Sequence, residues 1–275
     1  MGRTLYISDL DGTLLNSQKK LSPYTIEALN ELIGQQMNFS IATARTPATV
    51  EALLAEVKIK EPIVLLNGVA LYSLQTHTYL SVEYIKAQTV REILERVGDL
   101  MCEGFIYRIH DDALWVYYEN LEYKERRVFF EERQNNRYKH FLAKPLDSYE
   151  EVAYFIFIDD KEKIDLLCKK LKDVKEIGLV MYKDIYSTDA YILEVYSHRA
   201  TKANAINKLR LQGGYDKVIC FGDNLNDLSM FQVSEEAYAV ENAMEEVKRR
   251  ATAIIDANDK DGVVTFMQAH YKKEQ

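Results

Sequence analysis

Cysteine is scarce in this sequence, with three residues in 275. Cys102, Cys168 and Cys220 are odd in number and far apart, and no two of them form a Cys-x-x-Cys pair. We therefore expect neither a disulfide framework nor a cysteine-based zinc site. Such sparing use of cysteine is typical of a reducing compartment, and the expected location is the cytoplasm.

Long hydrophobic runs are also missing. The longest, such as Ile63–Leu66, fall far short of the ~20 residues that are needed to cross a bilayer. The N-terminus leads directly from Met1 into the apolar stretch before Asp9, without the basic region, apolar region and cleavage site of a secretory signal. The sequence therefore predicts neither a membrane span nor a secreted precursor.

An excess of positive charge is absent as well. The chain carries 35 Lys and Arg against 43 Asp and Glu, which gives a net charge of -8. Because this charge repels a polyanion at long range, nucleic acid is not an expected partner. The hydrophobic share of 47% and the charged share of 28% are typical of a globular protein with one large domain or two smaller ones.

Short apolar runs that end in polar or glycine residues recur near both ends of the chain. They lie at residues 5–8, 38–42, 63–66, 218–221 and 237–240. Such runs are typical of buried parallel strands. Between the first two, Ser22-Pro23 predicts the start of a helix that carries apolar residues at helical spacing. The alternation of strands and helices predicts an α/β fold with a Rossmann-like, doubly wound parallel sheet.

The stretch 80–197 has a different pattern, rich in Tyr and Phe that alternate with other residues. Asp111-Asp112 separates two alternating runs and predicts a hairpin loop. We therefore expect a discontinuous core of residues 1–79 and 198–275 with an inserted α+β domain of residues 80–197.

Aromatic residues of this inserted stretch allow two interpretations. Tyr107, Trp115, Tyr117 and Tyr118 could line a ligand pocket. Alternating aromatic residues on a hairpin are, however, more typical of core packing.

Two acidic clusters follow apolar runs. Asp9 and Asp11 follow the first run, and the alternation of side chains along a strand would point both carboxylates the same way. Asp223 and Asp227 follow the run 218–221. Either cluster alone has an ordinary interpretation as turn or helix-capping residues. Together, at the carboxyl ends of strands in one sheet, they would form the oxygen-rich site that magnesium requires.

These clusters belong to four motifs. In order along the chain they are Asp9-Leu10-Asp11-Gly12-Thr13, Thr43 within Ala42-Thr43-Ala44-Arg45, Lys202, and Gly222-Asp223-Asn224-Leu225-Asn226-Asp227. With this order the chain resembles the haloacid dehalogenase superfamily over nearly its whole length, and within it the Cof-type phosphatases with a large C2-type cap. Weaker similarities lie at Asn67-Gly68, Glu194, Asn242-Ala243 and residues 258–263, whereas Ala44 and Ala203 replace glycines that are usual in the family.

The resemblance implies a phosphatase that forms an aspartyl phosphate. Asp9 would be the nucleophile, and Asp11 would protonate the leaving oxygen and then deprotonate the attacking water. Thr43 would contact the phosphoryl oxygens through its hydroxyl and backbone N–H, and Lys202 would stabilise the phosphoaspartate.

The implied cofactor is Mg²⁺. It would be held by Asp9, the backbone carbonyl of Asp11 and Asp223, with Asp227 in support. The implied substrate contacts are Thr43, Arg45, Asn67, Gly68, Lys202 and Asn226. For Arg45, a surface ion pair is an equally good interpretation.

The expected partner is a small phosphate ester, and the resemblance places its selection in the inserted domain. Sugar phosphates and phosphorylated cofactors such as pyridoxal phosphate both fit. One alternative is a phosphomutase or phosphotransferase of the same superfamily. Another is a binding module without turnover, whose mark would be an incomplete acidic set.

Overall fold

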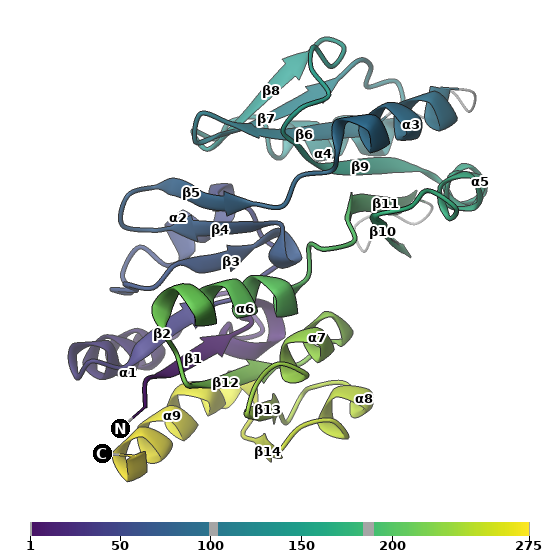
Figure 1. Cartoon of the computed structure of the whole chain (residues 1–275). Coiled ribbons are helices and arrows are strands. Elements are labelled where there is room, and N and C mark those ends of the chain that lie inside the picture. The colour runs from purple at the N-terminus through teal and green to yellow at the C-terminus, as the bar shows by residue number, and fades with distance from the viewer. Residues whose placement is uncertain (1, 99–103, 184–189, 275) are drawn as a thin grey trace. The chain divides into compact units, whose positions relative to one another are not determined.

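The computed structural model describes residues 2–98, 104–183 and 190–274, and the chain forms two compact units (Figure 1). The first unit comprises Met1–Ser81 and Thr201–Gln275, and the second comprises Val82–Ala200. The sequence placed the borders slightly earlier, after residues 79 and 197. The difference arises because β5 (Thr78–Val82) continues past residue 80, and because the N–H of Ala200 still donates to the carbonyl of Ser197 at 2.8 Å.

A five-stranded parallel sheet forms the centre of the first unit, in the order β14-β13-β12-β1-β2. Its strands are β1 (Thr4–Ser8), β2 (Asn38–Ile41), β12 (Lys217–Gly222), β13 (Glu236–Val240) and β14 (Ala253–Ile255). β1 lies between β2 and β12, with Ser8 opposite both Ile41 and Phe221 (Figure 1). Strands buried on both faces read as continuous apolar runs, so the predicted doubly wound parallel sheet is confirmed.

Helices cover both faces of this sheet. They are α1 (Pro23–Gly34), α2 (Pro47–Leu53), α6 (Lys202–Gly213), α7 (Leu228–Phe231), α8 (Glu245–Lys248) and α9 (Gly262–Glu274). α1 packs against α9 on one side, and α6 packs against α7 on the other (Figure 1). As predicted, Ser22 caps α1, because its hydroxyl oxygen accepts from the N–H of Thr25 at 2.9 Å.

The strand predicted at 63–66 is not a full member of the parallel sheet. β3 (Ile63–Leu65) pairs antiparallel with β4 (Ala70–Ser73), and β5 completes a three-stranded sheet. An isolated parallel bridge between Ala42 and Val64 connects it to the end of β2. The turn Leu66–Gly68, where all three residues have positive φ, reverses the chain directly after β3.

The second unit is built on a mixed sheet of six strands, in the order β10-β11-β9-β6-β7-β8. The strands are β6 (Gly104–His110), β7 (Ala113–Tyr118), β8 (Lys139–Ala143), β9 (Val152–Asp160), β10 (Ile177–Lys183) and β11 (Ala190–Ser197). α3 (Ala87–Gly98) and α5 (Lys161–Leu171) pack on one face, over Phe155 and Phe157. α4 (Lys124–Glu131) lies on the other face, where Phe129 contacts Phe105. The inserted domain is therefore α+β, as predicted.

The hairpin predicted at Asp111-Asp112 joins β6 and β7. Both aspartates have positive φ, 49° and 56°, as a tight two-residue turn requires. Of the aromatic residues on this hairpin, Tyr107 and Tyr117 are buried and Trp115 packs on His140 at 4.7 Å between ring centroids. Tyr107 and Trp115 therefore serve packing within the unit, whereas Tyr117 and Tyr118 also line a pocket of about 490 Å³ in the same unit.

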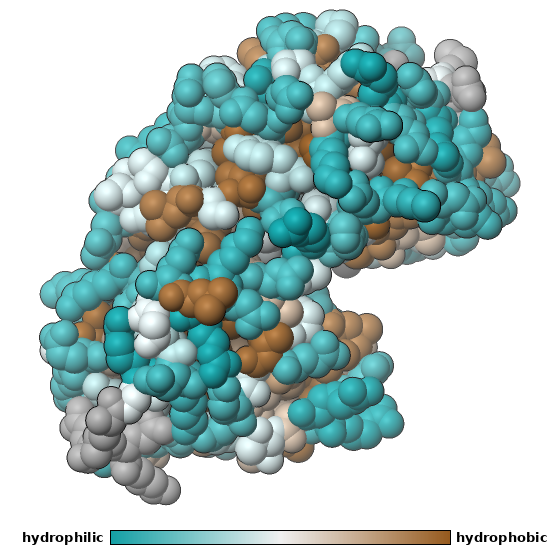
Figure 2. Space-filling model, viewed as in Figure 1, coloured by the Kyte–Doolittle hydropathy of each residue, from teal (hydrophilic) through white to brown (hydrophobic). Residues whose placement is uncertain are grey.

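The sequence predicted neither a membrane span nor a disulfide framework, and the structure describes the helices, the surface and two of the cysteines. No helix in the described part of the chain is long and apolar enough to span a bilayer. The face in Figure 2 is mostly hydrophilic, with hydrophobic residues in small separate groups. Cys168 and Cys220 are free thiols, and Cys102 lies outside the described residues.

Candidate functional site

Asp9 is the first residue after β1, at the carboxyl end of the central strand. Its N–H donates to the carbonyl of Phe221 at 2.9 Å, which continues the pairing of β1 with β12 by one residue. Asp9 is only 6% exposed. In open parallel sheets, ligands bind at this edge, so Asp9 is a buried carboxylate where a binding site is expected.

Asp11 has a different environment from Asp9. β1 ends at Ser8, and Leu10–Leu14 form an irregular turn in which Asp11 is extended, with φ -74° and ψ 116°, and Gly12 has φ 82°. The common direction of the two carboxylates stays a prediction. Asp9 is buried, whereas the Asp11 side chain is 46% exposed.

Arg45 holds the carboxylate of Asp11 in a bidentate ion pair. Its Nε donates to Oδ2 at 2.7 Å, and its Nη2 donates to Oδ1 at 2.6 Å. Both side chains are partly exposed, so the pair contributes little to stability. The planar fork does fix the orientation of the Asp11 carboxylate.

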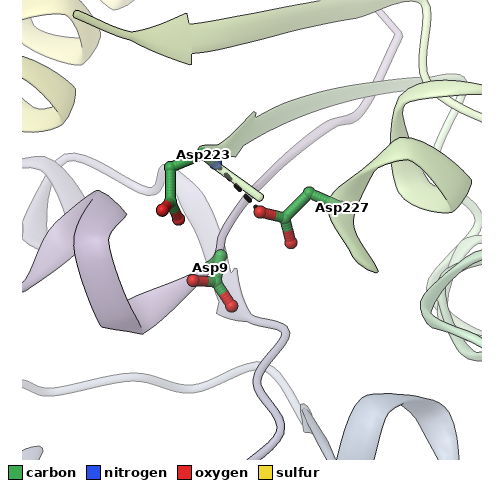
Figure 3. A group of neighbouring side chains, drawn as sticks. All are labelled: Asp9, Asp223 and Asp227. Carbon is green, nitrogen blue, oxygen red and sulfur yellow. Dashed lines mark hydrogen bonds between the residues drawn. The ribbon is translucent and has the colours of Figure 1, made fainter. Parts of the chain in front are cut away.

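Asp227 shapes the loop that follows β12. Its Oδ2 accepts from the N–H groups of Asp223 at 2.9 Å and Asn224 at 3.0 Å, and the first of these bonds is drawn in Figure 3. Asp227 is completely buried. The loop is thereby folded so that Asp223 and Asp227 both face the carboxylate of Asp9 (Figure 3).

Thr13 connects the first motif to the fourth. Its hydroxyl donates to Oδ1 of Asp223 at 2.7 Å. The motif alone indicated no role for Thr13. Its signal was a hydroxyl side chain one residue after the turn glycine, but the partner lies 210 positions away in the chain.

Lys202 is the first residue of α6, and its ammonium group lies between two carboxylates. Nζ donates to Oδ1 of Asp9 and to Oδ1 of Asp227, each at 2.6 Å. Lys202 is 1% exposed. Burial alone would lower its pKa, but the two carboxylates outweigh burial and raise the pKa above its ordinary value. Lys202 is therefore a permanently charged cation inside the site.

Three carboxylates converge in a way that suits a divalent cation. Oxygens of Asp9, Asp223 and Asp227 all lie within 4.8 Å of one another (Figure 3). Burial, reinforced by Asp227, raises the pKa of Asp223 to about 6 although Thr13 donates to it. Burial and the two neighbouring carboxylates likewise raise the pKa of Asp9 against the effect of Lys202. A hard cation with oxygen ligands, such as Mg²⁺, would relieve this repulsion, so the residues fit it.

Thr43 follows β2 and is 1% exposed. Its N–H donates to the carbonyl of Val64 at 2.9 Å, so the backbone donor expected to reach a phosphate is already used inside the fold. Its hydroxyl oxygen accepts from the N–H of Arg45 at 3.2 Å. The hydroxyl hydrogen is thus the group of Thr43 that can contact a ligand.

Asn67 joins the turn after β3 to two of the motifs. Its N–H donates to the carbonyl of Thr43 at 3.0 Å, and its Oδ1 accepts from Nδ2 of Asn226 at 3.0 Å. Asn67 has φ 54°, a left-handed conformation that asparagine tolerates better than most residues. The structure therefore brings Asn226 and Asn67 together, and their contact with substrate stays a prediction.

Gly68 allows the backbone of α6 to approach this turn. It has φ 108°, and a Cβ atom at this position would lie 2.2 Å from the carbonyl carbon and oxygen of Thr201. Thr201 immediately precedes Lys202. The glycine thus sets the position of the buried lysine.

We expect the change Gly68→Ala to lower the free energy of unfolding by about 3 kcal/mol or more, because it combines backbone strain with a clash against backbone atoms. Urea unfolding measures this change. Gly214→Ala is the control, since Gly214 also has positive φ, 63°, but has open space around a Cβ; its cost should be about 1–2 kcal/mol. Equal costs for the two variants would contradict the role of the close approach.

Two asparagines with weak sequence signals hold the turn after Asp9. Nδ2 of Asn242 donates to the carbonyl of Gly12 at 2.7 Å, and Nδ2 of Asn258 donates to the carbonyl of Leu15 at 2.8 Å. The N–H of Asn258 also donates to Oδ1 of Asn242 at 3.0 Å. Glu194, by contrast, lies in β11 of the second unit and accepts from the hydroxyl of Tyr182 at 2.7 Å.

Known proteins are similar to this chain along most of its length. A family model described as haloacid dehalogenase-like hydrolase matches residues 6–267. The 5-amino-6-(5-phospho-D-ribitylamino)uracil phosphatase YwtE of Bacillus subtilis is 29% identical, over 94% of this chain and 95% of the relative. The pyridoxal phosphate phosphatase YbhA of Escherichia coli is 26% identical, over 95% and 96%. The crystal structure of TM0651 from Thermotoga maritima has a TM-score of 0.78 at 25% identity, over 98% and 97%.

Proposed function

Because the chain belongs to the haloacid dehalogenase-like hydrolases and is a phosphatase of the Cof type, we propose that it hydrolyses a small phosphorylated metabolite with Mg²⁺ through an aspartyl phosphate on Asp9. One observation supports this most directly. The buried carboxylate of Asp9 is bound by Lys202 at 2.6 Å and lies within 4.8 Å of the carboxylates of Asp223 and Asp227. A nucleophile, a fixed cation and oxygen ligands are thus in one place.

The proposed ligands of Mg²⁺ are Asp9, Asp223 and the backbone carbonyl of Asp11. Asp227 supports them, because it binds the N–H of Asp223 and the ammonium of Lys202. Bound Mg²⁺ supplies positive charge that lets an anionic phosphate approach an anionic carboxylate.

In the first step, an oxygen of Asp9 forms a bond to phosphorus while the ester P–O bond breaks. Asp11, which first takes up a proton from solvent on one oxygen in place of one bond to Arg45, gives that proton to the leaving oxygen. In the second step, a water oxygen bonds to phosphorus, Asp11 takes the proton of that water, and the bond from phosphorus to Asp9 breaks. Lys202 and the Thr43 hydroxyl stabilise the negative charge of the phosphoryl group in both steps.

Arg45 acts in this scheme by orienting Asp11, rather than by binding the phosphate. We expect Arg45→Ala to lower kcat/KM about 10-fold or more for an alkyl phosphate, because the leaving alkoxide needs the proton of Asp11. For p-nitrophenyl phosphate, whose leaving group is stable without a proton, the loss should be much smaller. Asp11→Asn should show the same difference between substrates. Equal losses of Arg45→Ala on both substrates would instead indicate a phosphate contact.

A phosphate-release screen tests the proposed function. The panel includes 5-amino-6-(5-phospho-D-ribitylamino)uracil and pyridoxal phosphate, which the names of two relatives suggest, together with sugar phosphates. Release should stop in EDTA and return when Mg²⁺ is added in excess. Release that EDTA leaves unchanged would contradict the metal dependence, and release that requires a sugar acceptor would favour a phosphomutase. We assign the choice of substrate to the second unit.

A further inference from the structure

Lys139 in the second unit is a buried cation, and no carboxylate of the described residues pairs with it. It is 6% exposed although β8 is at the edge of the sheet. Within residues 104–183 and the other described ranges, no carboxylate lies at ion-pair distance from its ammonium group, which instead lies 5.3 Å from the ring centroid of Tyr107. Buried lysines are rare unless they are paired, so Lys139 calls for an explanation.

Tyr107 has a buried hydroxyl with no hydrogen-bond partner among the described residues. The residue is 1% exposed, and burial raises its pKa, so the hydroxyl stays a neutral donor. Buried polar groups are nearly always hydrogen-bonded. Next to the ammonium of Lys139 there is thus a second donor that is not used.

Arg133 adds a second positive charge to this place. Its guanidinium lies 4.1 Å from the ring centroid of Phe129, just after α4, and its side chain is 35% exposed. Burial, together with the charge of Arg133, lowers the pKa of Lys139 to about 8. Arg133 also donates to Glu132 at 2.6 Å, a pair on the exposed side.

Glu194 is a half-buried acid on the same face of the sheet as Lys139, but it has other partners. Tyr107 on β6 and Lys139 on β8 lie on the α4 face. Tyr107 pairs with Tyr154 on β9, which in turn pairs with Tyr196 on β11. Because Glu194 is two residues from Tyr196, it lies on the same face. β8 and β11 are four strand spacings apart in the sheet, or about 19 Å. Glu194 accepts from the hydroxyl of Tyr182 at 2.7 Å, and no ion pair joins it to Lys139 among the described residues.

We propose that Lys139 and Tyr107 bind a small oxyanion, a carboxylate or phosphoryl group, on the α4 face of the second unit. An ammonium group and a neutral hydroxyl are donors that such groups receive in proteins. The anion is either an acidic group of the enzyme's own substrate or a separate small anion. Binding itself does not depend on the proposed function, whereas the substrate alternative does.

Anion binding is tested by NMR on the full chain with ¹³C-labelled lysine, using inorganic phosphate and malonate as probes. The Lys139 signal, assigned by its loss in Lys139→Met, should shift to saturation with at least one probe. Tyr107→Phe removes one donor and should weaken this binding about 10-fold. The exposed Lys175 should not respond. A Lys139 signal that stays unchanged with both probes overturns the proposal.

Kinetics then distinguish the two sources of the anion. If the anion belongs to the substrate, Lys139→Met should raise KM about 10- to 100-fold for phosphate esters that carry a second acidic group and leave simple alkyl phosphates unchanged. If it is a separate anion, the NMR shift remains and KM changes for neither class. Lys175→Met is the matched control. A rise of KM for both classes, without an NMR shift, indicates structural damage and overturns the proposal.

The unfolding temperature of Lys139→Met distinguishes a binding role from a packing role. Loss of a binding residue should raise this temperature, whereas loss of a packing residue should lower it. Folding lowers the pKa of Lys139 from 10.5 to about 8, so between these values the unfolded chain binds more protons and stability rises with pH. Lys139→Met should therefore unfold at a higher temperature than the wild type at pH 7, with a difference that shrinks from pH 8 to pH 10.5. A lower midpoint at pH 7 would show that Lys139 stabilises the fold and would contradict its retention for binding.

Discussion

Asp9→Asn should reduce phosphate release by about four orders of magnitude or more, because an amide oxygen is a poor nucleophile and no other group of the cluster is placed to replace it. The expected loss holds for every substrate and at saturating Mg²⁺. The measurement is kcat with the best ester of the screen. Mass spectrometry of acid-quenched enzyme should find a phosphorylated peptide around Asp9 in the wild type and none in the variant.

The fold should survive this change. Asparagine has the shape of aspartate, and Lys202 keeps its bond to Asp227. Asp256→Asn, at an exposed position of the same unit, is the matched control and should have wild-type activity. Equal phosphate release by Asp9→Asn and the wild type would show that another group is the nucleophile.

Lys202→Met should affect both stability and catalysis. Removing the ammonium leaves Asp9 and Asp227 buried side by side without the cation between them, which should cost about 3–5 kcal/mol in the free energy of unfolding. The activity should fall about 10²- to 10³-fold, since a fixed charge next to the transferring phosphoryl group is lost. Urea unfolding and kcat measure the two effects.

The two effects can be separated. Asp227→Asn combined with Lys202→Met removes one of the two stranded charges and should recover part of the stability without recovering activity. Added Mg²⁺ should likewise raise the free energy of unfolding of Lys202→Met without restoring its kcat. Lys58→Met, at an exposed position of the same unit, controls for the loss of a lysine. If activity returns together with stability, Lys202 serves only the fold.

Local patterns explain why much of the fold could be predicted from the sequence. The apolar run 5–8 ends where β1 ends, and the run 218–221 ends one residue before the end of β12. Ser22 caps its helix, as its position before a proline indicated. The four motifs follow strand ends or open a helix, so their convergence in the first unit follows from a parallel sheet. The residue roles stay predictions that the variants above test.

Interactions between distant segments explain what was missed. The partner of Thr13 lies 210 positions away, and the fork of Arg45 on Asp11 spans 34. β5 was missed because it is short, its first, second, fourth and fifth residues are half-buried, and it lacks a clear alternation.

The split of the first unit also sets the order in which a nascent chain can assemble it. β1 and β2 leave the ribosome early, but β12, the other neighbour of β1, follows the whole of the second unit. The second unit is continuous in sequence and can fold first, since domains generally fold as units during synthesis. Lys202, Asp223 and Asp227 are then added to Asp9 last. A chain interrupted during translation therefore contains the predicted nucleophile without the groups that would activate it.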